Sequence, residues 1–370
     1  MTSVTHAADR PVSGPVADRG GILVPGPAAH PTRGQASLTP AEVAVILSTA
    51  ARAPSVHNTQ PWKFRVSGDV IELLADPDRL LRHADPAGRE LMISCGAALF
   101  GLRLGMRKFG YVPFAELLPD ASRPWLAGRV QPAGRAPATK VEVELAAAVP
   151  HRHTHRGAFS PGEIAPRLLA SLAVDSAAEG AELTLISRPA VIRELAVLIG
   201  LAADEQGADA QLTAELARWV PRTGADVREG VPAWARTGLR PGENAARQRD
   251  SAGAPSPVRL PQRDFGLPGT EPPDGEPPSV TAVLSTAADT PADWLRAGQA
   301  LHRLLLRAAS RWVFASLQTQ PLETPRHRKE VVDLLGLAGH PQMLLEFGRA
   351  NVAHATPRRP QAELRTHPGN

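Results

Sequence analysis

The feature that most constrains the fold of this chain is a long apolar stretch at residues 88–110, GRELMISCGAALFGLRLGMRKFG. The stretch is typical of a helix, and it is apolar on nearly every side except at Arg103, Arg107 and Lys108. A helix that is apolar all round is normally buried inside a protein. The stretch therefore predicts a central helix, in which Cys95 is a small core residue rather than a reactive thiol.

A second helix of this kind is expected at residues 290–312, TPADWLRAGQALHRLLLRAASRW, 202 positions after the first. A helix that begins with proline and leads into a strand also occurs twice, at 40–66 and at 166–186. This repetition predicts two related halves in one chain. The residue pairs that coincide under the shift of 202 are Gly96 and Gly298, Ala98 and Ala300, Leu99 and Leu301, and Leu104 and Leu306.

A polar turn follows the first helix at residues 52–64, RAPSVHNTQPWKF, and the second copy lacks it. Thr39 and Glu42 have the spacing of a capping box, with Pro40 at the first helical position. Pro54 then disfavours continuation of the helix. The sequence therefore places a Ser, His, Asn and Gln cluster just beyond a helix C-terminus.

The rest of the chain divides into folded halves, tails and an insert. Residues 1–36 are expected to be a disordered tail, 37–150 the first half, 151–363 the second half and 364–370 a short tail. Residues 221–278 are rich in Pro and Gly and are expected to form a lid-like insert. The expected strands are 62–66 and 70–76, joined by a tight turn, and 279–286 and 342–348.

The composition narrows the classes of function. The chain has 370 residues, with 41 Lys and Arg against 37 Asp and Glu and a net charge of +4, and the two signs are interleaved. This pattern indicates no nucleic-acid surface. One cysteine excludes an intrachain disulfide, and no apolar run reaches the about 18 residues of a membrane span. We expect a soluble cytoplasmic protein that binds neither nucleic acid nor membrane.

Two short patterns suggest other chemistry, and we weighed both. His151, His153 and His155 alternate along one segment, but no carboxylate or Cys accompanies them, so a metal site is not expected. Ser55 and His57 lie two positions apart, a spacing that does not form a nucleophile-base contact, and no strand-Ser-helix elbow surrounds them. Hydrolysis is therefore not expected either, and no residue is assigned a catalytic role.

Several motifs together resemble a known family. APSVHNTQPWKF closely resembles the isoalloxazine-binding turn of the FMN-dependent nitroreductase superfamily. With ISCGAALFGLRLGMRKFGY, PHRHTHRGAF, QPLE and GHPQMLLEFG…TPRRP, in that order, the chain resembles the Acg-like FMN-binding proteins of actinobacteria from about residue 38 to about residue 363. The resemblance implies an α+β, nitroreductase-like FMN-binding fold. Its two pseudo-symmetric halves would mimic the homodimer of ordinary nitroreductases within one chain.

The resemblance also implies one cofactor site between the halves. The turn and the QPLE loop would contact the flavin ring, while basic residues would bind the phosphate, a role that suits arginine because its planar fork bonds phosphate oxygens bidentately. The reciprocal site is expected to be absent. The implied cofactor-binding residues are Pro54, Ser55, Val56, Asn58, Gln60, Arg152, His153, Thr154, Arg156, Pro321, Leu322, Glu323, Arg358 and Arg359.

The implied function is an FMN-dependent oxidoreductase of nitroreductase type. NADH or NADPH would reduce the bound FMN, and the electrons would pass to an acceptor that the sequence does not identify. The alternative is a protein that stores or sequesters FMN beneath the 221–278 insert without turnover. A pseudo-dimeric monomer that acts on small molecules is expected, with further association left open.

Overall fold

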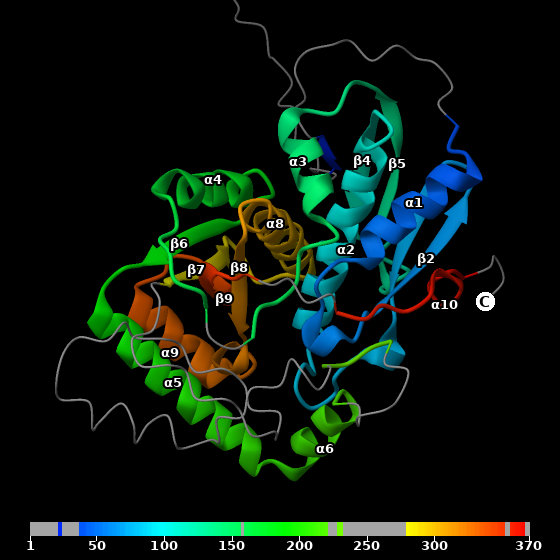
Figure 1. Ribbon diagram of the computed structural model, residues 1–370. Helices are drawn as coiled ribbons and strands as arrows, with labels where there is room; N and C mark the ends of the chain where they lie inside the picture. Colours follow the sequence, from blue (N-terminus) through cyan, green and yellow to red (C-terminus); the bar gives the residue numbers. More distant parts are fainter. Residues whose placement is uncertain are drawn as a thin grey trace, which may run out of the picture.

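The computed structural model describes residues 21–23, 37–156, 159–220, 228–231, 279–351 and 356–366. These residues form two antiparallel sheets with helices between and around them (Figure 1). The class is therefore mixed α and β, as expected. None of the helices in these ranges is long and apolar enough to cross a membrane.

The first sheet contains the hairpin that the sequence predicts. Trp62 pairs with Ala75, and Gly68 in the turn has a φ of 57°, which suits glycine. The strands are β1 (Gly21–Leu23), β2 (Trp62–Ser67), β3 (Val70–Ala75), β4 (Tyr111–Leu117) and β5 (Leu126–Arg135), in the order β1-β4-β5-β3-β2.

Strand β1 differs from the expectation for the N-terminal segment. Residues 1–36 were expected to lack structure, but Gly21–Leu23 pairs antiparallel with Phe114–Glu116 of β4. Strand β4 would otherwise be an edge of the sheet, and the composition of a segment does not reveal that its backbone can pair with such an edge. Residues 1–20 and 24–36 lie outside the described residues.

The second sheet has the same strand order as four of the five strands of the first sheet. It contains β6 (Glu182–Ile186), β7 (Val280–Thr286), β8 (Val313–Gln318) and β9 (His340–Arg349), in the order β6-β7-β9-β8. Read from its other edge, the first sheet runs β2-β3-β5-β4 before β1. The strands expected at 279–286 and 342–348 are thereby confirmed as β7 and β9.

The helices include those that the sequence predicts, and Thr39 and Glu42 form the expected capping box. The described helices are α1 (Pro40–Ala51), α2 (Arg89–Arg107), α3 (Lys140–Ala148), α4 (Pro166–Ala177), α5 (Pro189–Ala208), α6 (Ala210–Arg218), α8 (Pro291–Ala309), α9 (Pro325–Leu335) and α10 (Gln361–Leu364), with short 3-10 turns η1 (Val56–Asn58), η2 (Pro77–Arg79) and η4 (Gln320–Leu322).

Helices α2 and α8 pack against each other at the centre of the fold (Figure 1). Every residue of α2 is buried, as its apolar sequence predicts. A Cβ on Gly96 would overlap the carbonyl oxygen of Leu295, and a Cβ on Gly298 would overlap that of Ile93. Only glycine allows backbones to approach so closely.

The two central helices separate two hydrophobic cores. One core joins α1, the first sheet and α2, with Trp62 and Phe64 fully buried in it. The other joins α4, α8 and the second sheet, with Leu172 and Phe347 fully buried. The candidate site described below lies between these cores, where residues of the polar turn and α2 meet residues of α8 and the second sheet. Of the insert expected at 221–278, only residues 228–231 belong to the described part of the chain.

Candidate functional site

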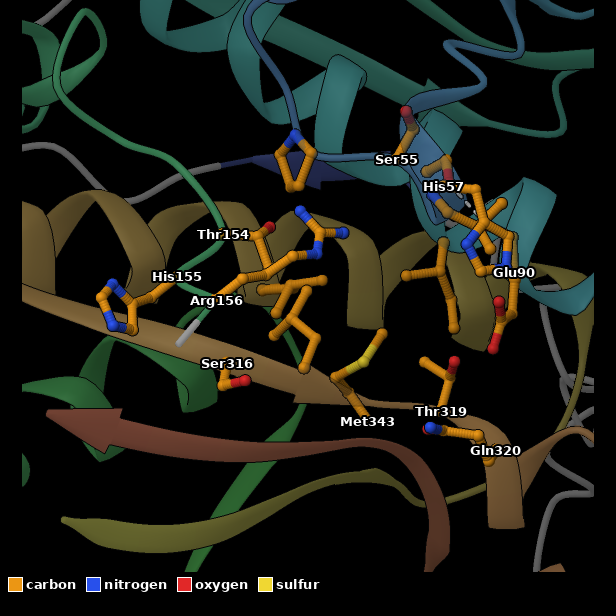
Figure 2. A pocket seen from close by; sticks show the side chains of 16 residues that line it. Ser55, His57, Glu90, Thr154, His155, Arg156, Ser316, Thr319, Gln320 and Met343 are labelled. Carbon is orange, nitrogen blue, oxygen red and sulfur yellow. Dashed lines mark hydrogen bonds between the residues drawn. The ribbon is translucent and has the colours of Figure 1, made fainter. Parts of the chain in front are cut away.

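A pocket lies where the polar turn, the N-terminal part of α2 and the ends of β8 and β9 meet (Figure 2). It contains about 780 Å³ of empty space, part of which is open to solvent. Arg156 and Thr154 lie on one side, and His57 and Glu90 on the other, with Met343 between them. The lining residues are Pro54, Ser55, Val56, His57, Glu90, Ile93, Ser94, Thr154, His155, Arg156, Leu301, Ser316, Leu317, Thr319, Gln320 and Met343.

The polar turn has an unusual backbone. His57, Asn58 and Gln60 have φ values of 44°, 56° and 50°, in the left-handed region that residues other than glycine rarely adopt. Ser55 holds the turn, since its Oγ accepts from the Gln60 amide at 3.0 Å and its carbonyl accepts from the Asn58 amide at 3.1 Å. Backbone strain of this kind clusters at functional sites.

The side chains of Asn58 and Gln60 hold the turn in place and do not line the pocket. Asn58 Nδ2 donates to the carbonyls of Gly230 and Pro357, at 3.1 and 3.2 Å. Gln60 Nε2 donates to the carbonyl of Arg228 at 2.8 Å, and its Oε1 accepts from the amide of Arg359 at 2.8 Å. The turn is therefore braced by two segments that are distant in sequence.

Arg152 and Arg358 converge on a single carbonyl oxygen at the C-terminus of α1. Arg152 Nη2 lies 3.0 Å and Arg358 Nη2 lies 3.2 Å from the oxygen of Arg52. Arg358 also donates to the carbonyls of Ala51 and Ala53. The negative end of the α1 dipole thus partly balances two cations.

Neither of these arginines has a carboxylate partner among the described residues. Burial lowers the pKa of Arg152 to about 10, and the charge of Arg52 adds to the effect. Burial also lowers the pKa of Arg358 well below its usual value, followed by the charges of Arg152 and Arg52. Arg152 Nε and Nη1 are buried and have no hydrogen-bond partner in the described ranges. A buried and a half-buried cation that both lack an acid have the chemistry of an anion site.

Residues 154–156 reach the pocket because they lie along the edge of β8. The His155 amide donates to the Ala315 carbonyl at 2.8 Å, and Thr154 forms a bridge with the same residue. This places Thr154 and Arg156 against the pocket, and burial lowers the pKa of Arg156 to about 10.

The histidines of this segment pack against aromatic rings. His153 lies 4.3 Å from Phe314 between ring centroids, and His155 stacks on Phe159 at 4.6 Å. Trp312 and Phe314 contact His151 and His153 and do not line the pocket. Within the part of the chain that the structure describes, no group of three His, Cys, Asp or Glu residues could hold a metal ion.

The loop after β8 forms another wall of the pocket, apart from Thr154 and Arg156. Thr319 and Gln320 line the pocket, whereas Pro321 and Leu322 are buried behind them. Glu323 accepts from Thr319 Oγ1 at 2.7 Å and from Gln206 Nε2 at 2.9 Å, so its carboxylate faces the loop and α5.

Carboxylates lie near the start of α2, on the side of the pocket away from Arg156. Glu90 pairs with Arg89 at 3.0 Å. Burial raises the pKa of Asp85 to about 6, against the lowering effect of the backbone amides of Leu91 and Glu90. The charge of Glu323 raises it further. Arg156 therefore lies on one side of the pocket, and Glu90, paired with Arg89, lies on the other.

The structure brings some of the expected site residues together and places others apart. Pro54, Ser55, Val56, Thr154 and Arg156 line one pocket, and Arg152 and Arg358 form one cluster. Arg359 is separate, since its guanidinium contacts Gln60 and Glu363. The sequence reasoning missed His57, Glu90, Ser94, Gln320 and Met343 as lining residues, and Arg52 as part of the cationic cluster.

One of these residues carried a signal in the sequence. Glu90 is an acid at the start of an otherwise apolar helix, and buried acids are rare without a specific role or partner. His57 and Gln320 stand in the polar turn and the QPLE loop that the sequence singled out, although neither was named as a site residue. Ser94 and Met343 carried no signal, because their place in the pocket depends on how distant segments pack.

Comparisons with known proteins identify the family. A chain of Mycobacterium tuberculosis named "Putative NAD(P)H nitroreductase Rv3131" is 32% identical over 328 residues, which cover 87% of this chain and 89% of the relative. The chain belongs to the Acg-like family of NAD(P)H nitroreductases. The relative named "Putative NAD(P)H nitroreductase acg", from the same organism, is 28% identical over 85% of this chain and 92% of its own length. No model of a known protein family matches the sequence.

Among solved structures, a nitroreductase with bound FMN from Desulfitobacterium hafniense covers 60% of this chain and 97% of its own, at 11% identity and a TM-score of 0.35. An FMN-dependent nitroreductase from Mycobacterium smegmatis in complex with NADPH covers the same shares, at 16% identity and a TM-score of 0.36. The family assignment follows from the sequence relatives.

Proposed function

We propose that the pocket binds one FMN and that the protein is an NAD(P)H-dependent flavin oxidoreductase of the nitroreductase type. The observation that carries this proposal is the pairing of the buried Arg152 with the half-buried Arg358, neither of which has a carboxylate partner among the described residues. Arg152 lies close to Arg156 in sequence, and Arg358 donates to Asn58 Oδ1 of the turn. FMN combines a dianionic phosphate with a planar ring, and the arginines and the pocket, whose lining mixes apolar and polar side chains, fit these two parts.

Different residues would bind different parts of FMN. Arg152, Arg156 and Arg358 would hold the phosphate, with the hydroxyl of Thr154 as a further donor. Pro54, Ser55 and Val56 would face the ring, while Asn58 and Gln60 keep the strained turn in shape. Pro321, Leu322 and Glu323 would position a backbone amide of their loop beside the ring, and His153 and Arg359 would support the segments on which these contacts depend.

When bound, FMN supplies reversible two-electron chemistry, accepting a hydride from NADH or NADPH and reducing a second molecule. The protein needs no nucleophile for this reaction. Its residues would bind and orient the reactants, and Ile93, Leu301 and Met343 would supply apolar contacts in the pocket.

We also infer that the two halves are copies of one unit, joined where a homodimer would have its interface. The shared strand order and the reciprocal contacts of Gly96 and Gly298 support this inference. In the second half, Glu179 follows α4 and pairs with Arg103 and Arg303 through buried contacts. An acid at the C-terminus of α4 opposes phosphate binding there, whereas arginines lie at the C-terminus of α1. We therefore expect one FMN per chain.

The test is anaerobic mixing of the FMN-loaded protein with NADPH or NADH, followed by the absorbance of the oxidised flavin. Loss of that absorbance on mixing is the expected result. If dithionite reduces the flavin and neither nucleotide does, the oxidoreductase proposal fails and the storage alternative is favoured. The ratio of FMN to protein in the same sample tests the stoichiometry, and a ratio of two would overturn the single site.

A further inference from the structure

The connection between β6 and β7 contacts the loop wall of the pocket in two ways: Leu195 and Ile199 share a hydrophobic cluster with Leu322, and one glutamine forms hydrogen bonds with the loop. Gln206, near the end of α5, is 6% exposed. Its Nε2 donates to the carbonyl of Gln320 at 3.1 Å and to Oε2 of Glu323 at 2.9 Å. Both amide protons of Gln206 are therefore used on one short loop, which fixes the backbone and the carboxylate of that loop together.

The same connection also contacts the first half of the chain. On α6, Glu215 Oε2 accepts from the amides of His83 and Ala84, each at 3.0 Å. Helix α6 lies below the first half, whereas α5 runs beside α9 of the second half (Figure 1). The two helices thus join both halves outside the central α2 and α8 pair.

Residues 228–231 extend these contacts to the polar turn. The Gly230 amide donates to the Asn58 carbonyl at 3.2 Å, and Asn58 Nδ2 donates back to the Gly230 carbonyl at 3.1 Å. Glu229 pairs with Arg79 at 2.6 Å. The Val231 amide donates to the carbonyl of Trp219, which follows α6, at 2.8 Å. The turn is thereby linked to α6 through hydrogen bonds.

We propose that α5, α6 and residues 228–231 act as a strap that fixes the two walls of the pocket relative to each other, with Gln206 as the positioning residue for the Thr319–Glu323 loop. The inference has one consequence that rests on the proposed function: the strap sets how firmly the cofactor is held and what environment the loop gives it. The contacts themselves are independent of any ligand.

Hydrogen exchange of the full chain without FMN tests the positioning role. Gln206→Leu removes both hydrogen bonds at nearly constant volume, and Gln211→Leu is the matched control because Gln211 is exposed on α6. The amides of Leu322 and Glu323 are bonded within the loop, to the carbonyls of Thr319 and Gln320. We expect Gln206→Leu to speed their exchange about tenfold or more, because a hydrogen bond to a charged group is lost. Equal exchange in the two variants would overturn the role of Gln206.

The FMN-loaded protein provides a second measurement. Gln206→Leu should release FMN about tenfold faster than the control and should shift the midpoint potential, because the loop no longer holds one arrangement. A change of thermal stability alone, with the release rate and the potential unchanged, would show that Gln206 is merely structural and would overturn the proposal.

Glu229→Gln tests the other end of the strap and keeps the proposal falsifiable if Gln206→Leu does not fold. The side chain of Glu229 is 41% exposed, so its replacement should leave the fold intact. We expect faster exchange of the Asn58 and Thr59 amides, which bond to the carbonyls of Ser55 and Val56. Unchanged exchange there would overturn the strap. A chain that binds no FMN would refute the proposed function but would leave these exchange results to be judged separately.

Discussion

Gly96 of α2 and Gly298 of α8 form a reciprocal contact. Gly96 faces the carbonyl of Leu295, and Gly298 faces the carbonyl of Ile93. The same shift of 202 positions relates Gly96 to Gly298 and Ile93 to Leu295. A contact in which each partner repeats the other's role is the geometry of an interface between two like units. The central packing of this chain therefore depends on two positions that carry no side chain.

Replacement of Gly298 by alanine should destabilise the protein. The added Cβ would overlap backbone atoms of α2, which cannot move aside as a flexible side chain can. We expect the free energy of unfolding in urea to fall by about 1–3 kcal/mol or more. The control is Gly200→Ala in α5, where nothing lies within 4 Å of the added Cβ. That variant should gain up to about 1 kcal/mol, and equal losses in both would contradict the close approach.

Replacement of Arg152 by methionine should separate ligand binding from stability. We expect FMN to bind about tenfold or more weakly, because a charge-assisted contact to phosphate is lost, while riboflavin, which has no phosphate, binds almost as before. In the absence of FMN the variant should be at least as stable as the parent, since a buried cation without a carboxylate has been removed. Equilibrium titration and urea unfolding measure these quantities.

Arg311→Met is the control for Arg152→Met, because the side chain of Arg311 is 55% exposed and pairs with Glu144 at the surface. It should change the free energy of unfolding by less than about 0.5 kcal/mol and leave both affinities as they were. If Arg152→Met weakens riboflavin and FMN equally, Arg152 is not a phosphate ligand.

Asp289 should make stability depend on acidic pH. Burial opposes its ionisation, but hydrogen bonds from Arg328, Trp294 and Gln342 outweigh that effect and hold its pKa well below the usual value. A carboxyl with a lowered folded pKa stabilises the protein above its unfolded pKa of about 3.9, and this contribution is lost as the pH falls.

Asp289→Asn should therefore be less stable than the parent at pH 7, by about 1–2 kcal/mol, and the difference should shrink as the pH falls from about 5 to about 3. Thermal or urea unfolding across this range measures it. Asp333→Asn, which removes only an exposed pair with Lys329, should show no such trend. A constant difference at all pH values would contradict the assignment.

Local patterns predicted much of this fold. The capping box of Thr39 and Glu42, the β2–β3 hairpin and the two central helices depend on neighbours within a few positions or on an apolar surface, and the sequence shows both directly. Strand β1 could not be predicted, because it depends on the open edge of β4 and not on its own composition.

The site was predictable only in part, for the same reason. The resemblance pointed to the turn, the arginines and the loop, and the structure brings many of them together. It could not show that the side-chain amide of Asn58 donates to the carbonyls of Gly230 and Pro357, or that Gln206 of α5 donates to Glu323. These contacts depend on how distant segments pack, and a lone Gln in a helix carries no signal of its partner.

The bracing of the polar turn has a consequence for the order of folding. Asn58 bonds to Pro357 and Arg358, which lie 299 and 300 positions away along the chain. Contacts between such distant residues form slowly, because a very large loop must close first. In a refolding experiment the circular dichroism signal of the two sheets should therefore return before the chain regains its capacity to bind a ligand. The delay between the two should lengthen when the docking of residues 356–366 is weakened.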